Sequence, residues 1–253
     1  MKLYVLDGGR IEILDWAVFQ PDAGPGVRRW LSDTCYLIVH PRGTLVWDTG
    51  LPGELADVPE GRTIPDIAVF HVREPLERQL AAIGHPADRI DYLALSHFHP
   101  DHVGNAGLFT NATLLVQHDE HAAAFGDAPG DFGFDRDTYE SLRSRATTLL
   151  HGDHDVFGDG SVLVKRLPGH TPGGQSLLVR LPDTGPVLIS GDLVHSLDNW
   201  TGRVVPRHNC DPGETRRSFD LAADLLAEEG AALWVQHDLD QQAALRHAPD
   251  YYT

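Results

Sequence analysis

The sequence predicts an α/β fold in which two β-sheets are sandwiched between helices, an αββα order, within a single domain. The chain has 253 residues, of which 42% are hydrophobic and 23% charged, so it can bury the core of one such domain. Apolar runs of strand length come first in a block and then alternate with helical segments, in two successive halves. No linker or internal repeat divides the chain, and we therefore treat residues 1–253 as one domain.

The first half opens with short apolar runs bounded by Gly, Pro and Asp, a pattern typical of strands. A Gly- and Pro-containing segment at residues 49–53 ends this block in a loop. Apolar residues at helical spacing between a proline and a glycine then predict a helix over residues 76–83. The strands that we expect in this half lie at residues 3–6, 11–14, 35–39, 44–47 and 92–95.

The second half alternates strands with helices. Asp211, Pro212 and Glu214 form a capping sequence, which predicts that the last long helix begins there. An irregular excursion is expected over the Gly- and Asp-rich residues 126–134. The other expected elements are strands at 112–116, 162–167, 176–181, 187–189 and 233–235, and helices near 121–125 and over 138–150.

The charge balance narrows the kinds of partner. Asp and Glu number 37 against 20 Lys and Arg, which gives a formal net charge of −17. Such a field repels polyanions, so we expect neither nucleic acid nor a membrane surface among the partners. The two cysteines, Cys35 and Cys210, make no disulfide framework, and the N-terminus lacks the apolar stretch of a secretory signal. We therefore expect a soluble cytoplasmic protein.

The strongest chemical signal is the segment Ser96-His97-Phe98-His99-Pro100-Asp101-His102, which follows an apolar strand. Imidazole and carboxylate groups are ligands that suit zinc and other first-row divalent ions. In an extended segment His97 and His99 point the same way, because side chains alternate with period two, so both can hold one ion. The proline after them turns the chain, which lets Asp101 and His102 address a second position nearby.

Three further ligand-type residues stand alone where apolar strands end. His170 lies in the glycine-rich segment 168–174 between two strands, where glycines let the backbone approach a ligand closely. Asp192 ends one apolar run and His237 ends another. Their common placement at strand ends puts all three on one rim of the predicted sandwich.

This pattern, His-x-His-x-Asp-His with a Gly-His turn, a Gly-Asp strand end and a late histidine, resembles the signature of the metallo-β-lactamase superfamily. The resemblance spans the chain from Asp48 to His237 and implies a metallo-β-lactamase-like αββα sandwich. It also implies two divalent metal ions, Zn²⁺ above all, although the ligands suit Fe or Mn as well. Asp48 resembles the family's supporting aspartate, which does not bind the metal. The ligand sets that the resemblance implies are His97, His99 and His170 for one ion, Asp101, His102 and His237 for the other, and Asp192 as the bridge.

Within the superfamily the chain is similar to the N-acyl-homoserine lactonase group, at residues 35–38, 45–50 and 248–252. The similarity implies hydrolysis of a lactone or related ester, in which a hydroxide shared by the two ions attacks the carbonyl. Asp101 would shuttle the proton to the leaving oxygen. These lactonases commonly place a tyrosine three residues after the bridging aspartate, where this chain has His195. We expect His195 to donate the corresponding hydrogen bond to the substrate carbonyl.

Other functions of the same fold fit this sequence less well. A thioester hydrolase of the glyoxalase II type usually adds a basic C-terminal helical region, whereas only residues 238–253 follow His237 here. Some β-lactamases carry a cysteine in the metal site, where this chain has Asp192. A nuclease conflicts with the negative charge, and di-iron oxidoreductases usually have a glutamate where this chain has His99. A non-catalytic metal-binding module would require the loss of ligands, and none of the seven is missing.

Two other segments rich in ligand-type residues, 118–121 and 151–155, are expected to lie on polar connections without a metal role. The loop after Asp192 contains Arg203, Arg207 and His208, and we expect this loop to face the substrate.

Overall fold

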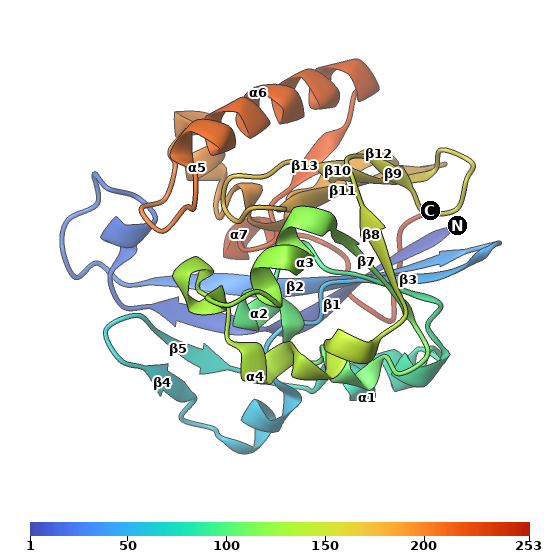
Figure 1. Cartoon of the computed structure of the whole chain (residues 1–253), viewed down its shortest axis with the longest axis horizontal. Coiled ribbons are helices and arrows are strands. Elements are labelled where there is room, and N and C mark those ends of the chain that lie inside the picture. The colour runs from blue at the N-terminus through green and yellow to red at the C-terminus, as the bar shows by residue number, and fades with distance from the viewer.

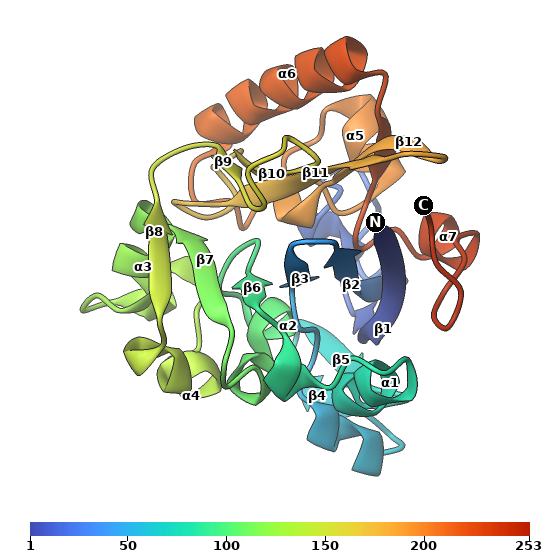
Figure 2. The same cartoon turned by 90° about the vertical axis from the view of Figure 1, so that its right-hand side faces the viewer.

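The computed structural model describes all residues from 1 to 253 and contains two β-sheets that are stacked face to face (Figures 1 and 2). The larger sheet has the strand order β4-β5-β1-β2-β3-β6-β7-β8, and the smaller one has the order β13-β12-β11-β10-β9. Helices cover the outer face of each sheet, which gives the αββα order that the sequence predicts (Figure 2).

The larger sheet combines an antiparallel part and a parallel part. Strands β1, β2 and β3 form an antiparallel meander, to which β6, β7 and β8 add in parallel. Strands β6 and β7 are covered on both faces, which explains why their apolar runs are nearly continuous, whereas the edge strand β8 is partly exposed. The strands are β1 (Lys2–Ile13), β2 (Arg29–His40), β3 (Gly43–Trp47), β4 (Arg62–Ile64), β5 (Ala68–His71), β6 (Tyr92–Ala94), β7 (Thr113–Gln117) and β8 (Thr147–Leu150).

The smaller sheet is antiparallel except for its last pair, in which β12 and β13 run parallel. Because these two strands run in the same direction, their carboxyl ends reach the same edge of the sheet. Its strands are β9 (His154–Asp155), β10 (Val162–Arg166), β11 (Gln175–Leu181), β12 (Gly185–Ile189) and β13 (Ala232–Trp234).

Helices form the two outer layers. The larger sheet is covered by α1 (Leu76–Ala82), α2 (Pro100–Val103), α3 (His118–Ala124) and α4 (Arg136–Tyr139), and the smaller by α5 (Leu197–Gly202) and α6 (Pro212–Glu229) (Figure 1). The short α7 (Leu239–Ala243) follows β13. As predicted, α6 begins after Asp211, whose carboxylate accepts a hydrogen bond from the Glu214 amide at 2.9 Å. None of the helices combines the length and apolar composition that a membrane-spanning segment requires.

The apolar core lies in layers that match this architecture. Between the sheets, Trp47 and Tyr36 of the larger sheet pack in one buried cluster with Leu177 of the smaller sheet. Outside the smaller sheet, Phe219 of α6 packs against Leu188. Each sheet is therefore buried on both faces, and the layers hold the strand ends in fixed relative positions.

Two expectations about local structure were wrong, and two strands were missed. The runs at 3–6 and 11–14 are one strand, β1, which has a bulge between Asp7 and Gly9 rather than a turn. Residues 138–150 are not one helix, because α4 ends at Tyr139, a 3-10 turn follows, and β8 begins at Thr147. Residues 147–150 pair with the edge of β7, and this pairing decides their structure more than the helical spacing of their apolar residues does. The short strands β4 and β5, which lie in the segment after the loop at 49–53, were missed because they are too short to show a pattern.

Candidate metal centre

The ligand-type residues are brought together at one edge of the sandwich by the ends of strands from both sheets. His97 and His99 follow β6 of the larger sheet, and α2 starts immediately after them. His170 lies between β10 and β11, while Asp192 follows β12 and His237 follows β13. Residues distant in sequence thus meet at one place because parallel neighbours end at the same edge.

The first group of side chains consists of His97, His99, His170 and Asp192, whose ligand atoms lie within 4.8 Å of one another. His99 Nδ1 is 2.8 Å from His97 Nε2 and 3.0 Å from His170 Nε2. Asp192 Oδ2 is 3.6 Å from His97 Nε2 and 3.2 Å from His170 Nε2. Four ligands at zinc–nitrogen bond lengths of about 2.0 Å form a tetrahedron with edges of about 3.3 Å, so this group fits one such ion.

The second group consists of Asp101, His102 and His237. The two Nε2 atoms of His102 and His237 are 3.2 Å apart, and they lie 3.3 Å and 2.9 Å from Asp192 Oδ1. Each of them also lies 3.9 Å from an oxygen of Asp101. The two oxygens of Asp192 therefore face different groups. Despite these short separations, the buried Oδ1 accepts no hydrogen bond of ordinary geometry, as expected of an atom whose partner is an ion.

The ring nitrogens on the far side of the five histidines are held by the protein. His99 Nε2 contacts the Phe132 carbonyl at 2.8 Å, and His237 Nδ1 contacts the Ser32 carbonyl at 2.6 Å. His97 Nδ1 lies 2.9 Å from Ser96 Oγ. Such contacts fix the orientation and tautomer of a metal-binding imidazole and leave its other nitrogen free for the ion.

Asp48 holds the ring of His102 in place. Its carboxylate accepts hydrogen bonds from His102 Nδ1 at 2.8 Å, from the Ser96 amide at 2.6 Å and from Gln236 Nε2 at 2.7 Å. Asp48 is fully buried and has a positive φ of 55°, a rare conformation that these three donors stabilise. The expected supporting role of this aspartate agrees with these contacts.

Sequence reasoning missed Glu120, which it placed on a polar connection. Glu120 is fully buried, and its carboxylate accepts hydrogen bonds from the Phe98 amide at 3.1 Å and the Gly173 amide at 2.8 Å. It therefore joins the loop that contains His97 and His99 to the loop that contains His170. Burial raises the pKa of Glu120 to about 7. The histidines next to Glu120 in the sequence give the segment the composition of a metal site, but they belong to neither ligand group. They therefore did not point to the role of Glu120.

Electrostatics differ between the two groups. Burial lowers the pKa of His97 well below its ordinary value and lowers the pKa of His99 to about 3, with His170 adding to the effect at His99. Burial acts in the same direction on His102 and His237, but the carboxylate of Asp192 outweighs it. The pKa of His237 is raised to about 9, and that of His102 is raised well above its ordinary value with the help of Asp48.

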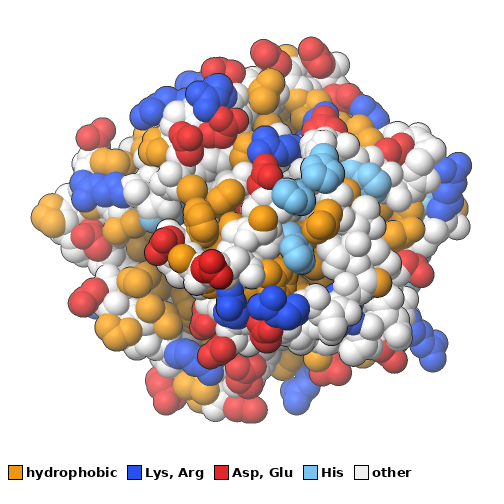
Figure 3. Space-filling model, viewed as in Figure 1, with side chains coloured by type: hydrophobic (Ala, Val, Ile, Leu, Met, Phe, Trp, Pro, Cys, Tyr) orange, Lys and Arg blue, Asp and Glu red, His pale blue; other side chains and the backbone are white.

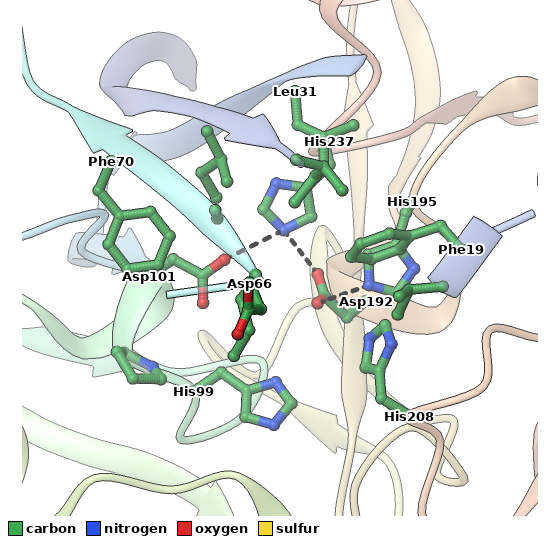
Figure 4. A pocket seen from close by; sticks show the side chains of 16 residues that line it. Phe19, Leu31, Asp66, Phe70, His99, Asp101, Asp192, His195, His208 and His237 are labelled. Carbon is green, nitrogen blue, oxygen red and sulfur yellow. Dashed lines mark ion pairs between the residues drawn. The ribbon is translucent and has the colours of Figure 1, made fainter. Parts of the chain in front are cut away.

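A cavity of about 290 Å³ opens above the two groups. Its apolar wall comes from β1, β2, the residues after β1 and the β4–β5 hairpin, and includes Phe19, Leu31 and Phe70 (Figure 4). Its base is made by Asp101, His99, Asp192, His237, His195 and His208. The missed strand β5 and the turn that precedes it thus supply one side of the cavity. A small molecule bound in this cavity would have its polar part near the two groups of metal-binding side chains and its apolar part against this wall.

The loop after Asp192 contributes one of its three expected residues to the cavity. His208 lines the cavity, whereas Arg203 forms an ion pair with Asp220 on the exterior. His195 also lines it and is buried, with Nε2 3.1 Å from Asp192 Oδ2. Acidic and basic side chains are interspersed on the face shown in Figure 3.

The stacked sheets and the paired ligand groups define a metal-dependent hydrolase whose site is suited to two divalent cations. The chain belongs to the metallo-β-lactamase superfamily, whose family model matches residues 28–229. It is 33% identical to the N-acyl homoserine lactonase AttM of Azorhizobium caulinodans, over 100% of this chain and 98% of that protein.

Two solved structures resemble the chain closely. One is an N-acyl homoserine lactone hydrolase with the product N-hexanoyl-L-homoserine at its catalytic metal center, with a TM-score of 0.86 and 27% identity. The other is an AiiA mutant from B. thuringiensis with N-decanoyl-L-homoserine at its active site, also with a TM-score of 0.86 and 27% identity. Each match covers 99% of this chain and 98% of the other.

Proposed function

We propose that this chain is a dinuclear metal-dependent lactonase that opens the ring of N-acyl homoserine lactones. The observation that carries the proposal is the pair of ligand groups at the base of an apolar cavity (Figure 4). The cavity wall suits an acyl chain, and cations at its base suit a lactone carbonyl. The related structures carry acyl-homoserine molecules of this kind at their active sites.

In this proposal His97, His99 and His170 would hold one divalent cation, most readily Zn²⁺. Asp101, His102 and His237 would hold the other, and Asp192 would be the residue that both cations share. The division of the Asp192 oxygens between the two groups supports the bridge. When bound, two such cations supply Lewis acidity, which lowers the pKa of water and polarises a carbonyl.

Opening a lactone adds water across the acyl C–O bond and yields a carboxylate, an alcohol and one released proton. Asp101 lines the cavity, and its side chain is 19% exposed while lying 3.9 Å from His102 and His237. It can therefore take a proton from the attacking water and give one to the ring oxygen as the C–O bond breaks.

His195 is our second catalytic residue. It lies at the cavity base, and its Nδ1 is buried without a hydrogen-bond partner. The Phe19 ring packs edge-on against it at 4.7 Å and limits its rotation. A neutral imidazole that carries its proton on Nδ1 can donate a hydrogen bond from this atom to the carbonyl oxygen as negative charge develops on it.

We also infer that the chain acts as one domain in the cytoplasm, with a small molecule as its partner. Leu3 pairs with Tyr252, so the two ends of the chain lie side by side. Both cysteines are unpaired, as is usual in a reducing compartment. The net charge of −17 disfavours nucleic acid and acidic membranes.

Proton release from a panel of acyl-homoserine lactones with varied chain length tests the proposal on metal-loaded protein. A simple γ-lactone and S-lactoylglutathione serve as comparison substrates, and Asp101→Asn and the distant His118→Ala are the test and control variants. We expect rapid opening of the acyl-homoserine lactones and a loss of about 10²-fold or more in Asp101→Asn alone. Turnover of the thioester only, or full activity in Asp101→Asn, contradicts the proposal.

A further inference from the structure

A third group of histidines lies beside the two proposed metal positions. His170, His195 and His208 offer ring nitrogens within 4.8 Å of one another. Their ring centroids form a nearly equilateral triangle with sides of 5.2, 5.3 and 5.4 Å. One tetrahedral ion requires nitrogen–nitrogen separations of about 3.3 Å, so the three rings would have to turn toward one another to bind it.

This triangle leads from the solvent to the metal centre. His208 is exposed and lines the cavity, whereas His195 and His170 are only 3% and 5% exposed. The Nδ1 atom of His195 is buried and has no hydrogen-bond partner within the protein. This atom is therefore open to a partner from outside the chain, such as an incoming ion before substrate binds.

His170 belongs to both this triangle and the first ligand group. Its Nε2 lies 3.0 Å from His99 Nδ1, and 3.2 Å from the Asp192 Oδ2 atom that is itself 3.1 Å from His195 Nε2. One nitrogen cannot bind two ions at once, so the triangle and the first position share a ligand and are occupied in turn.

From this arrangement we propose that His208, His195 and His170 form a loading position, through which a divalent cation passes on its way between solvent and the first metal position. The inference rests on the dinuclear centre proposed above. An incoming hydrated ion first exchanges water for His208 and His195 and then binds His170. It moves inward when the bonds to His208 and His195 are exchanged for bonds to His97, His99 and Asp192. Each step is a ligand exchange, and no electron is transferred.

Stopped-flow uptake of Co²⁺ by metal-free protein tests the loading position, with the visible absorption of bound Co²⁺ as the signal. Release into excess EDTA gives the reverse rate. In His208→Ala we expect both rates to fall by about tenfold, the effect of about 1.4 kcal/mol on a barrier. The affinity for Co²⁺ and the final stoichiometry of two Co²⁺ per chain stay unchanged. A substitution that affects only the loading path changes the rates of uptake and release by the same factor. His208→Asp, which restores a ligand atom, recovers most of the rate, and the exposed His118→Ala serves as the matched control.

Several results would overturn this inference. Unchanged rates in His208→Ala exclude a role on the path. A lower affinity makes His208 an ordinary ligand, and a third ion retained by the wild-type protein makes the triangle a stable site. If the wild-type protein holds fewer than two Co²⁺, the dinuclear centre itself is wrong and the loading position falls with it, which separates the two failures.

Discussion

The two proposed metal positions share Asp192 but differ in what surrounds them. In the first, burial lowers the pKa of His97 and His99, so these imidazoles are neutral before an ion arrives. In the second, carboxylates raise the pKa of His102 and His237, so these imidazoles carry protons until an ion replaces them. The first position is therefore prepared for metal by desolvation. The second is held together, in the absence of metal, by ion pairs between imidazolium and carboxylate.

The largest effect should come from Asp192→Ala, which removes the residue that the two positions share. We expect both ions to bind weakly and kcat/KM to fall by about 10³-fold or more, since the ions supply several kcal/mol of transition-state stabilisation. Metal content after gel filtration and steady-state kinetics measure this loss. A variant that keeps two ions would show that Asp192 is not the bridge.

Separate variants of the two groups should each affect one position. His99→Ala should leave one ion at the second position, and His237→Ala should leave one at the first. Loss of a residue that only supports a metal ligand lowers metal affinity by about 10–100-fold. Loss of a ligand itself should therefore lower the Zn²⁺ affinity of the altered position by more than this. Equilibrium dialysis with Zn²⁺ distinguishes these outcomes. Loss of both ions in both variants would mean that the positions bind as one unit.

The pH dependence of binding should differ between the positions. Because the pKa of His237 is about 9, this residue is protonated at pH 7 and must release its proton when the ion binds. Affinity at the second position should therefore fall as the pH is lowered from 9, by about tenfold per unit for each proton released. His97 and His99 should release no proton when an ion binds at the first position between pH 5 and 9, since burial holds the pKa of His99 at about 3 and that of His97 well below its ordinary value. Calorimetry in buffers of different ionisation enthalpy measures the protons, and equal release in both steps would refute the contrast.

Glu120 contacts only the loops that hold ligands of the first position. Its substitution should therefore change the free energy of unfolding. Glu120→Ala leaves two buried amides without an acceptor, so the free energy of unfolding should fall by about 1–3 kcal/mol. Urea denaturation measures it, with the exposed Glu140→Ala as the control. Because the folded pKa of about 7 is above the unfolded value, this carboxyl's contribution weakens as the pH rises from 4.5 to 7. A loss of stability no larger than that of the control would show that Glu120 does not join the two loops.

The sequence alone predicted the layers of the fold and the set of ligand-type residues, because the patterns that indicate them are local in the chain. His97 to His102 are adjacent in the chain, and Asp192 and His237 each follow an apolar strand whose end is easy to recognise. What it missed depends on long-range pairing. Strand β8 is fixed by its partner β7, and β4 and β5 are too short to show a pattern. The role of Glu120 comes from two loops that are distant in sequence, and nothing local distinguishes it from a surface glutamate.

The most direct test of the paired centre is anomalous diffraction at the zinc edge from crystals of the metal-loaded protein. We expect two peaks about 3.5–4 Å apart, one on each side of the Asp192 carboxylate. The first should contact His97, His99 and His170, and the second should contact the group of Asp101, His102 and His237. A single peak, or two peaks on the same side of Asp192, would contradict this expectation.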